Sequence, residues 1–189
     1  RIQADILIPD RKTDVDPGIL AEFAFDFSTN FLNEIVILNS SALTATTLEG
    51  LDFDIEYFSK GRIKTIEEYK KLPFKIIKDE SHPQVYNREF RISFYESNQY
   101  RLTLADNESH EDTELINPYT GKESKDFKLS VFWEREQDLN GREFYFVLRP
   151  FEDLVKEWNS KSNASYLREF TTIARVSLET ETPRKGADY

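Results

Sequence analysis

The clearest hydrophobic pattern of the chain lies between residues 127 and 158. From Phe127 to Trp133 apolar and polar residues alternate, and a period of two places the apolar set on one face of a β-strand. The run from 143 to 148 is apolar on both faces, which is typical of a central strand. Asn140-Gly141 lies between the two runs and accepts positive φ at low cost. The pattern therefore predicts an antiparallel hairpin that joins 127–134 to 142–148.

A helix is predicted directly after this hairpin. Pro150 ends the second strand, because proline cannot donate to a β-ladder but fits the first turn of a helix. The apolar residues that follow recur at the spacing of one helical face and are Phe151, Leu154, Val155 and Trp158. We expect Leu154 and Trp158 to be buried against a sheet.

The remaining segments give weaker patterns. A helix is predicted over 17–30, with Asp16 as N-cap and Pro17 in the first turn, although 21–27 also alternates like a strand. Further strands are predicted at 2–8, 34–38, 50–58 and 73–78, a second hairpin at 90–94 and 100–104, and a strand within 166–178. Irregular structure is predicted at 40–49, 65–71 (a short helix or turn), 105–125 and 159–163.

These elements predict a single α+β domain over residues 1–180, followed by a C-terminal tail at 181–189. We expect a mixed but mostly antiparallel β-sheet with a few packed helices. A chain of 189 residues is long enough to bury a substantial core. With 15 Phe and 9 Tyr, that core is expected to be rich in aromatic side chains.

The charge of the chain limits the classes of partner. The formal net charge is −10, and an acidic surface repels phosphate backbones, so direct nucleic-acid binding is disfavoured. The chain has no Cys, which excludes disulfides and thiolate metal sites. Its two histidines, His82 and His110, form no metal-ligating cluster, and the longest uncharged apolar run is far too short to span a bilayer.

One order of elements suggests a catalytic chemistry. A helix bearing Glu22 precedes a strand with Asp52 and Asp54, and a further strand ends at Lys78. This order resembles the core of the PD-(D/E)xK nuclease superfamily. The resemblance implies that Glu22 and Asp54 bind Mg²⁺, with Asp52 as an alternative strand acid, and that Lys78 stabilises developing charge. The chain has Ile76 where that family has an acidic residue or Gln. The acidic-x-Lys pattern of the family does occur as Asp126-Phe127-Lys128, but this segment lies far along the chain.

The sequence therefore favours a non-catalytic interaction or assembly domain with a protein partner and no cofactor. A Mg²⁺-dependent nuclease with Glu22, Asp52, Asp54 and Lys78 in its site is the first alternative. An acidic mimic of nucleic acid, which would occupy a DNA-binding partner, is the second and depends on the net charge alone.

Overall fold

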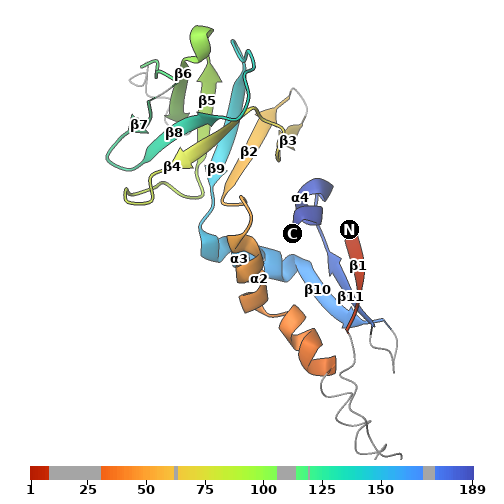
Figure 1. Ribbon diagram of the computed structural model, residues 1–189. Helices are drawn as coiled ribbons and strands as arrows, with labels where there is room; N and C mark the ends of the chain where they lie inside the picture. Colours follow the sequence, from red (N-terminus) through yellow and green to blue (C-terminus); the bar gives the residue numbers. More distant parts are fainter. Residues whose placement is uncertain (9–30, 62–63, 106–113, 119, 168–172) are drawn as a thin grey trace, which may run out of the picture. The chain divides into compact units, whose positions relative to one another are not determined.

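The computed structural model describes residues 1–8, 31–61, 64–105, 114–118, 120–167 and 173–189 (Figure 1). The fold class is α+β, as predicted. The described strands form three separate sheets in which every ladder is antiparallel, in place of the single mixed sheet that we expected. Contacts divide the chain into two compact units, which we call unit 1 (Arg1–Asp52 and Glu152–Tyr189) and unit 2 (Phe53–Phe151). The single domain over 1–180 stays a prediction.

Unit 2 consists of two antiparallel sheets. The five-stranded sheet has the order β3-β2-β9-β5-β6, and the three-stranded sheet has the order β4-β8-β7. The strands are β2 (Ile55–Lys60), β3 (Thr65–Glu67), β4 (Phe74–Lys78), β5 (Glu89–Phe94), β6 (Tyr100–Leu104), β7 (Lys122–Glu123), β8 (Lys128–Trp133) and β9 (Glu143–Leu148). A short 3₁₀ turn, η2 (Glu96–Asn98), connects β5 to β6 and confirms the second predicted hairpin.

The inner faces of the two sheets share one aromatic core. Alternation along β8 buries Phe127, Leu129 and Val131 as predicted, and β9 is the central strand of its sheet. Phe90 and Phe146 stack with their ring centroids 5.0 Å apart. The large side chains that are fully buried here include Phe74, Phe90, Phe94, Tyr100 and Phe146.

Polar contacts connect the five-stranded sheet of unit 2 to β4 and to the segment that precedes β7. The hydroxyl of Tyr57 in β2 accepts from the backbone N–H of Ile76 in β4 at 2.8 Å. Tyr100 in β6 forms a β-bridge with Ile116, and its hydroxyl donates to the carbonyl of Thr120 at 2.7 Å. Each contact satisfies backbone groups at a sheet edge that would otherwise need water.

The hairpin predicted between 127–134 and 142–148 is wrong. Strands β8 and β9 exist, but β8 pairs with β4 and β7, whereas β9 pairs with β2 and β5. The Asn140-Gly141 turn itself is present: Arg142 N–H donates to Leu139 O at 2.8 Å, and Gly141 has φ of 72°. The turn therefore redirects the chain from one sheet to the other, because a local turn signal does not specify the strand partners.

Unit 1 contains a three-stranded sheet and several helices. The sheet has the order β1-β11-β10, and the predicted edge strand at 2–8 is confirmed as β1. Its elements are β1 (Ile2–Leu7), a helical segment at 31–38, α2 (Ser41–Glu49), α3 (Phe151–Lys161, which begins at the last residue of unit 2), β10 (Ser162–Tyr166), β11 (Ile173–Leu178) and α4 (Pro183–Asp188).

Helix α3 confirms the predicted helix at 151–158. Leu154 and Trp158 are buried, while Phe151 at the start of the stripe is exposed. The Trp158 ring packs on Tyr189, with centroids 4.8 Å apart. Nearby, the hydroxyl of Thr44 in α2 donates to Asn159 Oδ1 at 3.1 Å. Residues 181–189 were predicted as a C-terminal tail. Because Tyr189 packs on Trp158, residues 183–189 form a packed helical end instead.

Helix α4 lies very close to the sheet of unit 1. A Cβ added at Gly186 would lie 2.9 Å from Ile2 Cδ1 and 3.1 Å from Leu178 Cδ2. A larger residue at 186 would require these flexible side-chain ends to shift, so the missing side chain favours the close approach of α4 to β1 and β11.

Several other predictions differ from the structure. Residues 34–38 are helical rather than a strand, and 40–49 is not a loop, because Ser40 caps α2 by accepting from Leu43 N–H. The predicted linker at 159–163 forms the end of α3 and the start of β10, and 65–71 contains β3. In the predicted surface loop, 114–125 holds the buried Ile116 and β7. The helix predicted at 17–30 lies outside the described residues.

Candidate functional site

Asp54 and Lys78, which the nuclease resemblance pairs, lie together in unit 2. Lys78 ends β4, and its side chain points to the same side as the buried Ile76. Asp54 directly precedes β2 in the other sheet. Lys78 Nζ lies 3.0 Å from Asp54 Oδ2 and 3.1 Å from Glu80 Oε1, and the Lys78 side chain is 17% exposed. The ion pair thus connects the ends of two sheets, not two paired strands.

The surroundings of Lys78 favour its charged form. Partial burial lowers the pKa of Lys78, but hydrogen bonds to Asp54 and Glu80 outweigh this effect and raise it above its ordinary value. The ammonium group therefore stays protonated at neutral pH. It can stabilise a negative charge, but it cannot act as a general base there.

The two other residues of the predicted nuclease site, Glu22 and Asp52, stay a prediction. Asp52 belongs to unit 1, and Glu22 lies outside the described residues. Across the described ranges, no group of three or more His, Asp or Glu residues could hold a metal ion. In the described residues, the Asp54 carboxylate forms an ion pair with the Lys78 ammonium group.

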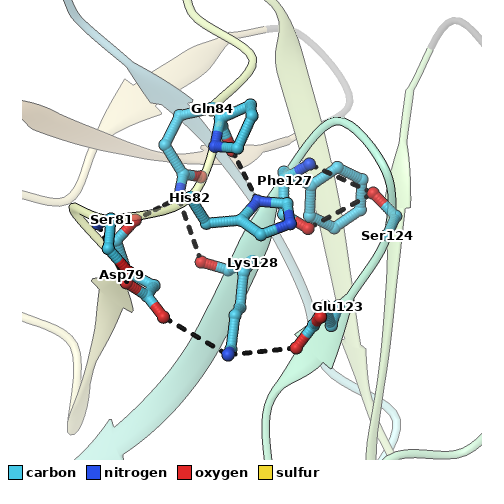
Figure 2. A network of polar contacts seen from close by, with 9 residues as sticks. Asp79, Ser81, His82, Gln84, Glu123, Ser124, Phe127 and Lys128 are labelled. Atoms are coloured by element: carbon cyan, nitrogen blue, oxygen red, sulfur yellow. Dashed lines mark hydrogen bonds and ion pairs between the residues drawn. The ribbon is translucent and has the colours of Figure 1, made fainter.

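A second charged network lies at the same end of β4 (Figure 2). Figure 2 shows Lys128 between two carboxylates: Lys128 Nζ lies 3.0 Å from Glu123 Oε2 and 3.3 Å from Asp79 Oδ2. The other oxygen of Asp79 accepts from the backbone N–H and the hydroxyl of Ser81, at 3.0 and 2.6 Å. The network ties the turn after β4 to strands β7 and β8.

These contacts shift the pKa values of both partners in the direction that keeps them charged. Hydrogen bonds from Ser81 and then Lys128 hold the pKa of Asp79 below its ordinary value. Hydrogen bonds to Glu123 and Asp79 raise the pKa of Lys128. His82 lies in the same turn, where its Nδ1 is 2.9 Å from the carbonyl of Pro83 and its backbone N–H donates to Asp79 O. The geometry is that of an ordered turn with ion pairs.

The outer face of β4 and β8 carries exposed apolar side chains. We define the β4–β8 face as Lys75, Ile77, Lys128, Ser130 and Phe132, the residues that alternate with the buried positions of these strands. Phe132 is 58% exposed and Ile77 is 48% exposed. The register places Lys75 opposite Phe132 and Ile77 opposite Ser130. Ile77 and Phe132 are therefore diagonal neighbours on one face, within reach of each other.

Ion pairs lie at both ends of this face. Lys75 Nζ is 3.0 Å from Glu134 Oε1 beside Phe132. At the other end, Lys128 makes its contacts with Asp79 and Glu123. The face thus has an apolar centre between charged ends.

Sequence reasoning set Lys128, Ser130 and Phe132 apart from the apolar face of their strand and predicted only a strand for 73–78, so it did not single out this face. The available signal was the size of two residues: Ile77 and Phe132 are large and apolar at positions where the alternation predicts polar side chains. Asp79 and Glu123 were not predicted as partners of Lys128, because they lie on a turn and on a short strand that have no periodic pattern.

Comparison with known proteins gives no further assignment: no protein-family model matches the chain, and no curated protein matches its sequence significantly. In the described part of the chain, no helix is long and apolar enough to cross a membrane.

Proposed function

We propose that the chain is a non-catalytic protein-interaction or assembly domain and that the β4–β8 face is its contact surface. The observation that carries this proposal is the exposure of Phe132 and Ile77 as neighbours on one sheet face. Scattered apolar residues on a surface are ordinary, but an apolar centre with a polar rim is the usual anatomy of an interface. Aromatic side chains are also enriched among residues that dominate binding energy.

The ion pairs at the ends of the face serve orientation more than affinity. Exposed ion pairs contribute little net stability, since water and salt screen them. Across an interface, however, charges fix the register of a partner and disfavour wrong partners. Lys75–Glu134 and Lys128–Glu123 place both signs of charge beside the apolar centre. We expect the partner to cover Phe132 and Ile77 and to match these charges at its rim.

A photo-crosslinking experiment tests the surface. A benzoylphenylalanine is placed at position 132, and in a matched control at position 66, since Ile66 is 46% exposed on β3 of the other sheet. In extracts of the native source we expect a crosslinked partner from position 132 that is much weaker from position 66. Ile77→Asp should remove the crosslink from position 132 without altering the circular dichroism spectrum. Equal crosslinking from both positions, or persistence in Ile77→Asp, contradicts the proposal.

The approach of Lys78 to Asp54 supports a second candidate, a Mg²⁺-dependent nuclease. In that function Asp54 binds Mg²⁺, which requires a carboxylate oxygen at about 2.0–2.1 Å from the ion, and Lys78 stabilises the developing charge. Two results together would favour this candidate: a melting temperature that rises with Mg²⁺ or Mn²⁺, and cleavage of DNA or RNA. Both should be lost in Asp54→Ala and retained in the control Glu136→Ala. Neither effect is expected if the chain is an interaction domain.

A further inference from the structure

Strand β1 forms one outer edge of the sheet in unit 1, and most of its residues are exposed. Among the described strands the sheet order is β1-β11-β10, so β1 pairs with β11 on one side and with no described strand on the other (Figure 1). From Gln3 to Leu7 every residue is exposed, and Leu7 reaches 67%. An edge strand of six residues presents backbone donors and acceptors to any strand that can align with it.

The hydrogen-bond pattern shows which backbone groups of β1 face outward. Leu167 N–H donates to Ile173 O, and Glu179 N–H donates to Lys161 O, so the odd-numbered residues of β11 bond to the β10 side. In an antiparallel ladder the direction alternates, so the even-numbered residues of β11 bond to β1. Their partners are Ile2, Ala4 and Ile6. The N–H and C=O groups of Gln3, Asp5 and Leu7 therefore point away from the sheet.

Side chains or bridges protect the other long edges within the described residues. On β10, the Asn39 amide donates to the carbonyl of Ala164 at 2.9 Å and accepts from its N–H at 2.8 Å. The Tyr57 hydroxyl occupies the N–H of Ile76 on β4. Along β6, Ile116 bridges to Tyr100, and the Lys122 ammonium donates to the carbonyl of Leu102 at 3.0 Å. Native sheets commonly protect their edge strands from pairing with other chains in such ways.

Among the described residues, no side chain or bridge protects the outer edge of β1 in this way. Its sequence, Ile-Gln-Ala-Asp-Ile-Leu, contains no Pro or Lys. Its one charge, Asp5, is bound by Arg175 on the adjacent strand through two contacts of 2.7 and 2.8 Å. Hydrogen bonding to Arg175 also lowers the pKa of Asp5. The charge that could repel an incoming strand is thus neutralised by its own sheet.

We propose that β1 is the site at which a second copy of this chain adds, so that two β1 strands pair antiparallel across a two-fold axis. The sequence of β1 is complementary to itself in this arrangement. With Ala4 opposite Ala4 of the second copy, Ile2 lies opposite Ile6, and Gln3 lies opposite Asp5. Apolar residues then meet apolar residues, and an amide donor meets a carboxylate, both of which are favourable cross-strand pairs.

The outward groups select this register. The outward groups of Gln3, Asp5 and Leu7 must pair with the same outward groups in the second copy. Two registers meet this condition and retain most of the strand: one is centred on Ala4 and the other on Asp5. The register centred on Asp5 places two carboxylates, both hydrogen-bond acceptors, directly opposite each other and gives up the Gln3–Asp5 pair. The register centred on Ala4 avoids that contact. It extends the sheet to six strands with Ile2, Ala4 and Ile6 of both copies on the same face.

This proposal is independent of the β4–β8 face, because it depends on a strand in unit 1. The two proposals are tested by separate variants. Isologous two-fold contacts are the commonest form of homo-oligomer, and the strand addition used here requires no rearrangement of the described sheet.

A cysteine crosslink tests the register. The chain has no Cys, so Ala4→Cys introduces the only thiol. Ala4 bonds to β11, so the Ala4–Ala4 pair is of the non-hydrogen-bonded type, with Cα atoms about 4.5 Å apart, a separation that a disulfide can span. We expect Ala4→Cys to oxidise to a covalent dimer at low protein concentration. Gln3→Cys is the matched control, because its symmetry mate lies two positions away, at about 7–8 Å or more.

The mass of the unmodified chain in solution tests the dimer itself. Sedimentation over a range of concentrations should show a reversible monomer–dimer equilibrium. Gln3→Pro removes an outward N–H and should shift the chain to monomer, whereas Gln3→Ser retains the N–H and should still dimerise. Leu7→Lys provides a second edge substitution that spares the ladder with β11. A chain that stays monomeric at high concentration, a dimer unaffected by Gln3→Pro and Leu7→Lys, or equal crosslinking of the two cysteine variants overturns the proposal.

Discussion

The hydroxyl of Tyr57 accepts a hydrogen bond from the backbone N–H of Ile76 at 2.8 Å, and this contact joins the two sheets of unit 2. Tyr57 lies on β2, and its ring packs on Phe74 and Phe146 in the shared core. The Tyr57 side chain thus contributes to the core and also accepts a hydrogen bond from a backbone N–H on the edge of β4. The edge of β4 is consequently less available for pairing with another strand.

Removing this hydroxyl should destabilise unit 2. In Tyr57→Phe the ring can pack as before, but the Ile76 N–H loses its partner, and a part-buried donor without a partner costs about 1–3 kcal/mol. Urea unfolding measures the loss, and hydrogen exchange at the Ile76 amide should accelerate. The control is Tyr86→Phe, since Tyr86 is exposed. Equal stability of Tyr57→Phe and the control would show that the hydroxyl contact contributes nothing.

Substitutions at Gly141 should lower stability through the backbone conformation that they must adopt, and not through the volume of the new side chain. Its φ is 72°, and a Cβ added there would meet nothing within 4 Å. Gly141→Val should therefore lose about 1–3 kcal/mol through the strained backbone alone. Gly141→Asn should lose clearly less, because Asn tolerates the left-handed region. If chemical denaturation gives the same loss for both variants, steric contact rather than φ determines the cost.

Leu154 and Trp158 should behave as core residues of unit 1. Leu154 is 1% exposed, so Leu154→Ala should cost about 2–5 kcal/mol. Trp158 is 3% exposed, and its fluorescence should be blue-shifted and poorly quenched by iodide. The measurement needs a Trp133→Phe background, because the chain has two tryptophans. Efficient quenching in that background would place Trp158 at a surface.

The Asp79 network should make stability depend on acidic pH. The folded state holds the pKa of Asp79 below its ordinary value, which is about 3.9 in an unfolded chain. A carboxyl with a lowered pKa stabilises the folded state above the unfolded pKa, and this contribution is lost as pH falls through the folded pKa. The stability difference between the unmodified chain and Asp79→Ala should therefore be constant near neutral pH, begin to decrease near about pH 4, and vanish once the pH is below the folded pKa of Asp79.

Unfolding curves from pH 7 to pH 2 measure this difference, with Asp126→Ala as a control for net charge, since Asp126 is exposed. A difference that persists in strong acid would show that Asp79 acts through something other than its charge.

The local parts of the fold could be predicted from the sequence, because they depend on residues close together in the chain. Alternation located β5, β6 and β8, a run that is apolar on both faces located β9, and the spacing of Leu154 and Trp158 located α3. The α+β class followed from these elements. The Gly141 turn was also predictable, since its conformation depends on one residue without a side chain.

The pairing of strands could not be predicted in the same way. Nothing near Asn140 specifies that β8 pairs with β4, because that choice depends on side chains more than 50 residues away. Residues 34–38 were predicted as a strand, but they lie within the helical segment 31–38. In the folded chain, Asn39 at its end bonds to Ala164, 125 residues later, and this contact has no local signal. Tertiary context overrides weak propensity in such segments.

The candidate site was predictable only in part. The contact of Asp54 with Lys78 was expected from the nuclease resemblance, and the two side chains do meet. The β4–β8 face could not be recognised before the register was known, because the register makes Ile77 and Phe132 neighbours. Exposure of a residue is a property of the folded chain that alternation can only suggest.

The pairing of Ile2 with Leu178 has a consequence for the order in which the molecule is assembled. Unit 1 is built from two stretches of chain with all of unit 2 between them. During synthesis from the N-terminal end, the strands of unit 2 emerge together, while β1 remains without β11 until residues 173–178 have left the ribosome. Closing so long a loop is entropically slow unless the intervening segment is already compact. Early folding of unit 2 would shorten this search and let β1 meet β11.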